Sequence, residues 1–208
     1  MAGLAACIVF LFGAGVVGAL TVEEGEAASN SGGSPPVTEP GPPAPPIDLA
    51  AVIVPGPAGF DQIPDARLQV GGPVDVERLA AERGDQTKAV FQETRLVNGF
   101  VRAWQNPTTL ELATVRLYQF ADEAGAASYS KRVVQAMSKA PASTFVVPAT
   151  TDTVGIDTRV DQGANRVAYV FTRRGRVVAA IAAASAQPVE AGFLPAFARS
   201  QLSLLPQG

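Results

Sequence analysis

The chain has 208 residues, enough for one domain of ordinary size with accessory segments. Its net charge of −3 is uneven, because residues 1–66 hold seven acidic residues and no Lys or Arg, which leaves 16 basic and 12 acidic residues beyond them. Apart from Arg173, Arg174 and Arg176 the basic residues are scattered, so there is no basic stripe of the kind that binds nucleic acid. We therefore expect no nucleic-acid partner.

Histidine is absent, and the single cysteine, Cys7, lies in an apolar N-terminal segment. The rest of the chain thus offers no disulfide, no thiol nucleophile and no histidine base or metal ligand. It also carries no nucleophile elbow and no phosphate-binding glycine loop. We predict no cofactor and no enzyme activity. The alternative is a hydrolase that uses only carboxylates, which would need two inward carboxylates in one cleft.

One group of acidic residues has the chemistry of a cation site: Asp152, Asp157 and Asp161. Arg159 stands where a calcium loop needs an oxygen ligand, and no glutamate closes the loop. We interpret these residues as turn-forming and predict no metal site.

Residues 4–20 are seventeen consecutive uncharged, mostly apolar residues, close to the minimum length of a membrane-spanning helix. Three interpretations stay open for residues 1–21: an uncleaved anchor, a cleaved signal peptide, and a lipoprotein signal. The last would lipidate Cys7, and it is the least expected because the apolar stretch follows the cysteine instead of preceding it. The glutamates within 23–26 favour a cytoplasmic N-terminus and an external C-terminal domain. We expect a single-pass protein of the cell membrane, or a secreted protein if the segment is cleaved.

Residues 22–58 are dense in Pro, Gly and Ser and predict a linker between the membrane segment and a domain over 59–208. The apolar run Ile47–Val54 interrupts this composition. It is either a strand that latches the linker onto the domain or a plain apolar stretch of linker. The excess of Arg over Lys, with abundant Ala, Gly and Pro, is typical of a high-GC bacterium such as an actinomycete.

Hydrophobic periodicity predicts the elements of the domain. Helices are expected over 75–82, 85–95, 122–139 and 189–204. Strands are expected over 98–105, 110–120, 143–147, 165–173 and 176–185. Neighbouring strands that are joined by short turns predict an α+β fold, with a single antiparallel sheet and helices packed on it, preceded by the transmembrane helix and the linker.

The sheet is expected to be apolar on both faces. In the run VVAAIAAAS at 177–185 the side chains on both faces of the strand are apolar, which predicts a central strand. We expect it to pair with the preceding strand so that Tyr169 faces Ala180. Leu112 is expected on one face together with the aromatic residues below. Helices are expected to cover one of the two apolar faces. The other face needs a second cover, which is another helix, a partner chain, or an apolar ligand with arginine at its rim. The predicted ligand or partner face comprises Phe100, Arg102, Trp104, Arg116 and Tyr118.

A pattern runs from Gly99–Phe100 and Trp104, through Tyr118–Gln119–Phe120 and the run at 121–126, to Tyr129. It resembles secreted and lipoprotein-like α+β domains of actinobacteria. It is loosely similar to the extracytoplasmic PknH-type sensor domain and to PsbP/Mog1-like mycobacterial lipoproteins. The shared positions are core positions, so the resemblance implies a fold and an extracytoplasmic location but no functional residue.

The sequence therefore predicts a non-catalytic, membrane-tethered module that binds a ligand or a protein partner at the bacterial cell envelope. A carboxylate-dependent hydrolase and a structural spacer in an envelope assembly are the alternatives. A spacer would have neither a cavity nor a cleft.

Overall fold

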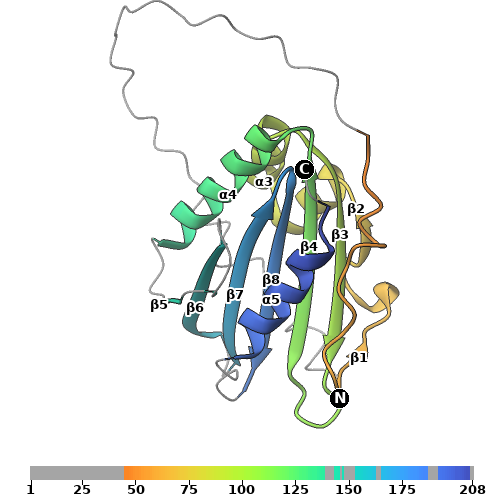
Figure 1. Ribbon diagram of the computed structural model, residues 1–208, viewed down its shortest axis with the longest axis vertical. Helices are drawn as coiled ribbons and strands as arrows, with labels where there is room; N and C mark the ends of the chain where they lie inside the picture. The colour runs from red at the N-terminus through yellow and green to blue at the C-terminus, as the bar shows by residue number, and fades with distance from the viewer. Residues whose placement is uncertain are drawn as a thin grey trace, which may run out of the picture.

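The computed structural model describes residues 45–138, 143–145, 147, 153–162, 165–186 and 192–206. Within these ranges the chain forms one eight-stranded antiparallel sheet with helices packed on it (Figure 1). This confirms the predicted α+β class. The strands are β1 (Asp61–Gln62), β2 (Gly72–Val74), β3 (Leu96–Gln105), β4 (Leu112–Phe120), β5 (Ser143–Phe145), β6 (Thr153–Gln162), β7 (Asn165–Arg174) and β8 (Val177–Ser185). The helices are the 3₁₀ helix η1 (Asp65–Arg67) and the α-helices α2 (Val76–Arg83), α3 (Asp85–Glu93), α4 (Glu123–Ser138) and α5 (Phe193–Leu204).

The strand order is β1-β3-β4-β8-β7-β6-β5, and β2 pairs with β3 beside β1. Both β4 and β8 are buried along their whole length. β8 lies between β4 and β7, as its two-sided apolar sequence predicted. Small alanines along β8 let covering elements approach the sheet closely from either side.

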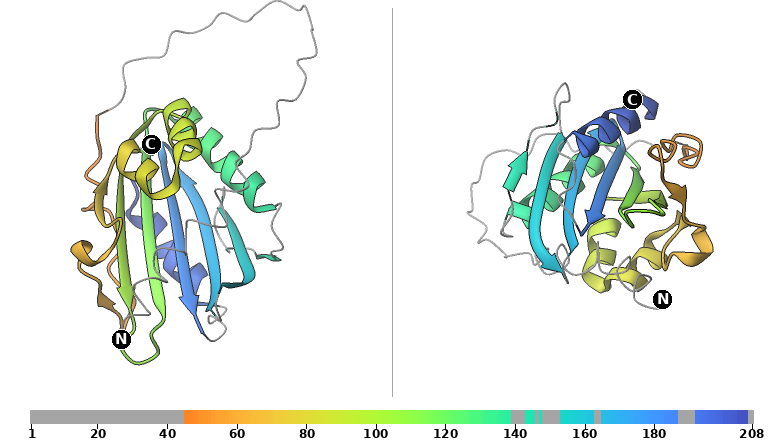
Figure 2. Two further views of the ribbon diagram at one scale, coloured as in Figure 1. Left: turned by 180° about the vertical axis from the view of Figure 1, so that it is seen from behind. Right: turned by 90° about the horizontal axis from the view of Figure 1, so that it is seen from below.

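The two faces of the sheet have different covers (Figure 2). Helices α2, α3 and α4 cover one face, where Leu79, Phe91 and Tyr129 pack on the sheet. Helix α5 covers the other face together with a segment of irregular backbone, residues 45–60, which we call the strap. Leu194 of α5 and Leu49 of the strap belong to this second core. The second cover that the sequence required is therefore provided by the chain itself.

The strap contains residues that composition assigned to the linker. Leu49, Ile53 and Val54 are at most 6% exposed, so this part of the chain packs as core rather than as a spacer. The apolar run latches onto the domain through turns and side chains, and it forms no strand. The rest of the predicted linker, the membrane segment at 4–20 and Cys7 lie outside the described residues.

Two fully buried glutamines hold the strap backbone. Gln119 of β4 accepts a hydrogen bond from the amide of Ile47 (2.7 Å) and donates one to the carbonyl of Pro45 (3.1 Å). Gln201 of α5 accepts from the amide of Val54 (2.9 Å) and donates to the carbonyl of Val52 (2.8 Å). Each side-chain amide satisfies both a donor and an acceptor that a strand partner would otherwise have to satisfy.

Two strand registers differ from the predicted ones. In the β7–β8 hairpin the chain turns at Gly175 and Arg176, so Tyr169 pairs with Ala182 instead of Ala180. This shift of two residues keeps every side chain on its predicted face. In the β3–β4 hairpin Phe100 pairs with Leu117 and Trp104 with Ala113, and a bulge follows Leu96. That register places Phe100 and Trp104 on the face opposite to the predicted one, because a slip of one residue reverses the side chains of a strand.

The ten-residue strand β6 was missed, because its polar residues were interpreted as turn-forming. β6 pairs with β7 on one side and β5 on the other, so main-chain hydrogen bonds and not apolar alternation define it. The short strands β1 and β2 were also missed, since two or three residues give no periodicity. Helix α3 begins at Asp85, as predicted, and Gly84 occupies its N-cap position.

Candidate functional site

The structure divides the five residues of the predicted ligand face between the two faces of the sheet. Phe100, Arg102 and Trp104 alternate along β3 and point toward the strap and α5, with the Arg102 guanidinium 5.0 Å from the centroid of the Phe100 ring. Arg116 and Tyr118 of β4 point toward α2, α3 and α4. The predicted grouping of these residues on one face is therefore wrong, for the register reason given above.

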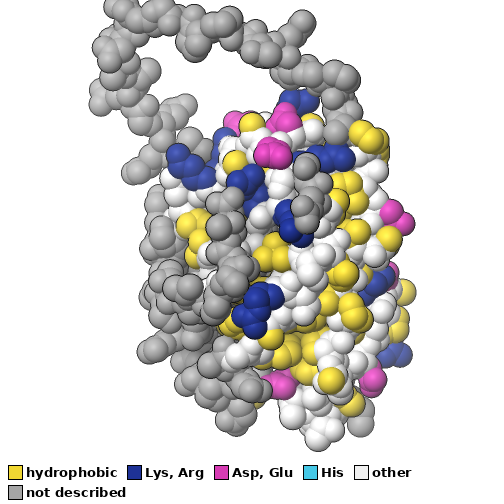
Figure 3. All heavy atoms as spheres, in the orientation of Figure 1, with side chains coloured by type: hydrophobic (Ala, Val, Ile, Leu, Met, Phe, Trp, Pro, Cys, Tyr) yellow, Lys and Arg dark blue, Asp and Glu magenta, His cyan; other side chains and the backbone are white. Residues whose placement is uncertain are grey.

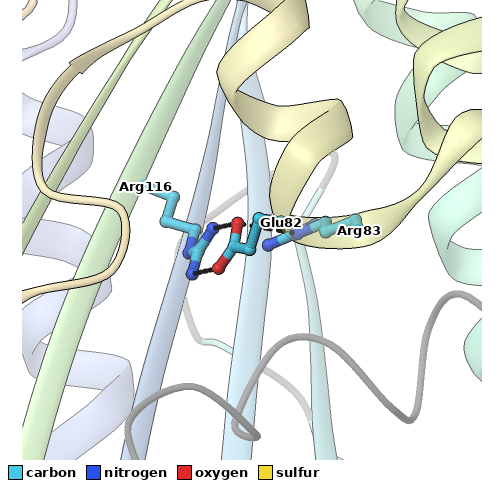
Figure 4. A network of polar contacts seen from close by, with 3 residues as sticks. All are labelled: Glu82, Arg83 and Arg116. Carbon is cyan, nitrogen blue, oxygen red and sulfur yellow. Dashed lines mark hydrogen bonds and ion pairs between the residues drawn. The ribbon is translucent and has the colours of Figure 1, made fainter.

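On the face of α2 to α4, Arg116 forms a buried bidentate ion pair with Glu82, the penultimate residue of α2 (Figure 4). Both nitrogen–oxygen distances are 2.8 Å, and the two side chains are only 5% and 4% exposed. Arg83 approaches the same carboxylate from the other side, with its Nε 3.3 Å from Glu82 Oε2. The parallel pair of hydrogen bonds fixes the end of α2 against the middle of β4.

Burial and charge act in opposite directions on these groups. Burial by itself raises the pKa of Glu82, but the hydrogen bonds and charges of Arg116 and Arg83 outweigh it and hold the pKa below its usual value. Burial by itself lowers the pKa of Arg116, but the Glu82 carboxylate raises it by more. The pKa therefore stays above its usual value, and the guanidinium stays charged. Burial raises the pKa of Tyr129 and brings that of Tyr169 to about 12, against the opposing charges of Arg83 and Arg116.

These groups stay in fixed protonation states at neutral pH. The side chains of Glu82 and Arg116 are almost inaccessible to solvent. On the same face of the sheet the rings of Phe91, Tyr118 and Tyr129 pack against one another with centroids 5.2–5.7 Å apart. A catalytic acid or base must reach its substrate. We therefore assign the Glu82–Arg116 pair to the attachment of α2 and not to a binding site.

On the opposite face there is a pocket of about 440 Å³, which we call the α5 pocket. It lies where β8 ends and β4 begins, between the N-terminal half of α5 and the last residues of the strap. Figure 3 shows hydrophobic side chains gathered over α5 and the strap on this side of the molecule. The residues that line the pocket are Pro57, Ala58, Phe60, Glu111, Leu112, Ala183, Ala184, Ser185, Phe193, Ala196, Phe197 and Ser200.

Three phenyl rings form one wall of the α5 pocket. Phe60 of the strap stacks on Phe193 of α5 at 5.9 Å between centroids, and Phe193 stacks on Phe197 at 5.8 Å. Ala183 and Ala184 of β8 offer only methyl groups, which leaves room beside the rings. Within the described ranges the polar lining residues are one carboxylate, Glu111, and two hydroxyls, those of Ser185 and Ser200. The arrangement suits an apolar ligand with few polar groups.

Trp104 lies behind this wall. It is 3% exposed and meets the Phe197 ring edge-on at 5.8 Å. Gly56 of the strap lies so close to its indole that an added Cβ would be 2.3 Å from Trp104 Cδ1. Trp104 thus belongs to the core between sheet, strap and α5, and its fluorescence reports on the pocket without contacting the ligand.

A second, more open hollow of about 390 Å³ lies between the strap and the start of α2. Two carboxylates, Asp48 and Asp75, line it, which is the feature that a carboxylate hydrolase would need. Both are exposed, and each uses an oxygen for local structure: Asp48 accepts from the amides at 50 and 51, and Asp75 caps α2 by accepting from the amide of Arg78 (2.8 Å). Capping accounts for both residues without catalysis.

The described residues include no group of three or more His, Cys, Asp or Glu side chains placed to hold a metal ion. Asp152 and the side chains of Asp157 and Asp161 lie outside what the structure describes, so the predicted absence of a metal site there stays a prediction. Among the helices of the described ranges, none has the length and apolar character needed to cross a membrane.

Sequence reasoning missed the residues of the α5 pocket, apart from Leu112 and the alanines of β8. The available signal was the helical series Phe193, Ala196, Phe197 and Ser200, which places these four side chains on one side of α5. Phe60 and Glu111 lie in irregular segments, where no periodicity marks them.

Comparison with known proteins gives a likeness of fold. No family model matches the chain, and no curated protein matches it. Among solved structures the fold is similar to the crystal structure of the extracellular domain of PknH from Mycobacterium tuberculosis, with a TM-score of 0.50 and 11% sequence identity. The match covers 78% of this chain and 98% of that chain. The predicted loose similarity to a PknH-type domain is therefore confirmed for the fold.

Proposed function

We propose that this protein is a non-catalytic module that works outside the cytoplasm, tethered by its N-terminal segment, and binds a small apolar ligand in the α5 pocket. The fold likeness to an extracellular domain and the apolar sequence at 4–20 support the location. The observation that carries the binding role is the pocket itself. Its volume of about 440 Å³ falls within the range of about 300–1,000 Å³ that is usual for small-molecule sites.

A binding role also accounts for how the pocket is built. Phe60, Phe193 and Phe197 leave one wall apolar although the mouth is open to solvent, while the core beneath is closed by Trp104. A purely structural spacer needs no such opening.

The hydrolase alternative rests on Asp48 and Asp75, and its test is whether Asp48→Asn and Asp75→Asn abolish any hydrolytic activity found with ester or glycoside substrates.

The test of ligand binding uses the full chain in detergent and the uncharged fluorescent probe N-phenyl-1-naphthylamine. Saturable enhancement of probe emission above that of the same detergent without protein, whose micelles also take up the probe, is expected together with a change in Trp104 emission. Ala196→Phe should remove most of the enhancement, because Ala196 is an exposed lining residue whose larger replacement fills the mouth. Ser203→Phe, which makes the same kind of change at an exposed position of α5 outside the lining, is the matched control.

Equal enhancement in wild type and Ala196→Phe, with unchanged thermal unfolding of both variants, would refute the α5 pocket as the site. Digestion of the domain by protease added to intact cells tests the location. A domain that survives until the cells are lysed would refute an external position.

A further inference from the structure

The charge distribution around the α5 pocket points to one class of ligand. Among the lining residues that the structure describes, Glu111 is the only charged one, and none of them is Lys or Arg. The ion pairs found among the described residues do not include Glu111. The two other polar side chains of the lining are serine hydroxyls, which tolerate either a donor or an acceptor. The described part of the rim is therefore acidic.

The structure holds Glu111 in a defined position. Its carbonyl accepts a hydrogen bond from the amide of Asn106 (2.9 Å), which closes the β3–β4 turn. The side chain of Asn106 accepts from the amides of Thr108 and Thr109 and so orders the loop. The Thr109 hydroxyl lies 3.0 Å from Glu111 Oε2, which orients the carboxylate. A carboxylate fixed in this way loses little side-chain entropy when it meets a ligand.

We propose that the ligand of the α5 pocket is an amphiphile with a cationic head, such as a long-chain amine, whose apolar part packs on Phe60, Phe193 and Phe197 while its ammonium group meets Glu111. This inference rests on the proposed function. The phenyl rings of the wall would also attract the ammonium group, since the face of an aromatic ring attracts a nearby cation. An anionic amphiphile such as a fatty acid would bring its carboxylate toward Glu111 and bind less tightly.

The experiment is displacement of N-phenyl-1-naphthylamine by decylamine, decan-1-ol and decanoate at neutral pH in the same detergent, and the change that each compound causes in protein-free detergent is subtracted. The three compounds share one chain length and differ in head-group charge. Decylamine is expected to displace the probe at about fivefold lower concentration than decan-1-ol, and decanoate at a higher one, because a partly exposed ion pair contributes up to about 1 kcal/mol. Added salt should reduce the difference.

Glu111→Gln removes the charge and keeps the shape, so the three compounds should then displace the probe at concentrations within about twofold of each other. Asp85→Asn, at an exposed acid on the opposite face of the sheet, should keep the wild-type order. Wild-type displacement without regard to charge, or best by decanoate, would overturn the cationic ligand and leave the proposed function standing. A probe that does not bind at all would instead overturn the proposed function.

Discussion

Replacing Arg116 by methionine tests the role assigned to the buried ion pair. The Glu82 carboxylate would keep its buried position, with its side chain 4% exposed in the wild type, but would lose both 2.8 Å hydrogen bonds from Arg116. Removing one partner of such a pair leaves an uncompensated charge in the core. We expect the free energy of unfolding to fall by about 3 kcal/mol, the lower end of the range for buried pairs, because Arg83 remains beside the carboxylate.

The double variant Glu82→Leu/Arg116→Met is expected to be more stable than Arg116→Met alone. It removes both charges together, and apolar side chains of similar size replace a buried pair at little cost. Urea denaturation followed by circular dichroism of the wild type, of Glu82→Leu and Arg116→Met singly, and of the double variant gives the four free energies of a double-variant cycle. Lys88→Met, which removes the exposed pair of Lys88 with Glu77, is the control and should barely move the transition midpoint.

The pH dependence has a definite sign. The pKa of Glu82 is lowered in the folded state, so its contribution to stability is complete above the unfolded pKa of about 4.3 and is lost as the pH falls through the folded value. In Arg116→Met, burial without that partner raises the pKa of Glu82. The stability deficit of the variant should therefore shrink between neutral pH and about pH 4, where the carboxyl group takes up a proton. A deficit under about 1 kcal/mol, or one that does not change with pH, would refute the reasoning.

Two further predictions concern other buried polar groups. Gln201→Leu removes both hydrogen bonds to the strap and leaves a buried amide and carbonyl of the strap unpaired, so unfolding should become easier by about 2–4 kcal/mol and the strap should be cleaved sooner in limited proteolysis. An unchanged cleavage rate would show that the strap is held by its apolar side chains alone. Burial raises the pKa of Tyr169 to about 12, above the unfolded value of about 10, so this residue contributes stability that is complete below about pH 10 and is lost as the pH rises toward 12. Tyr169→Phe should flatten the alkaline decline in stability, and a decline as steep as that of the wild type would contradict this assignment.

Much of the fold could be predicted from residue patterns. The two-sided apolar run of β8 predicted a central strand, and β8 is buried along its whole length between β4 and β7. The helical spacing around Tyr129 predicted α4, and Asp122 caps it by accepting from the amide of Gly125 at 2.7 Å. These predictions succeeded because burial on one face of a helix or both faces of a strand leaves a local period in the sequence.

The candidate site could not be predicted in the same way. Alternation along β3 and β4 established which residues of each strand share a face, but the relative register of the two strands depends on the turn at 106–111 that joins Gln105 to Leu112. A single-residue slip reverses one strand against the other, and this separated Trp104 from Tyr118. The buried pair of Glu82 and Arg116 was equally hidden, since 34 residues separate the two charges.

The sequence by itself determined the four strands β3, β4, β7 and β8, the absence of histidine and of any thiol beyond Cys7, and the apolar character of both sheet faces. Only the tertiary structure decided that the strap covers one face and that Phe60, Glu111, Ala184 and Phe197 line a single pocket. The physical reason is that these four residues come from the strap, a turn, a strand end and a helix. Local periodicity carries no information about such distant neighbours, which meet only when strand register and helix packing are in place.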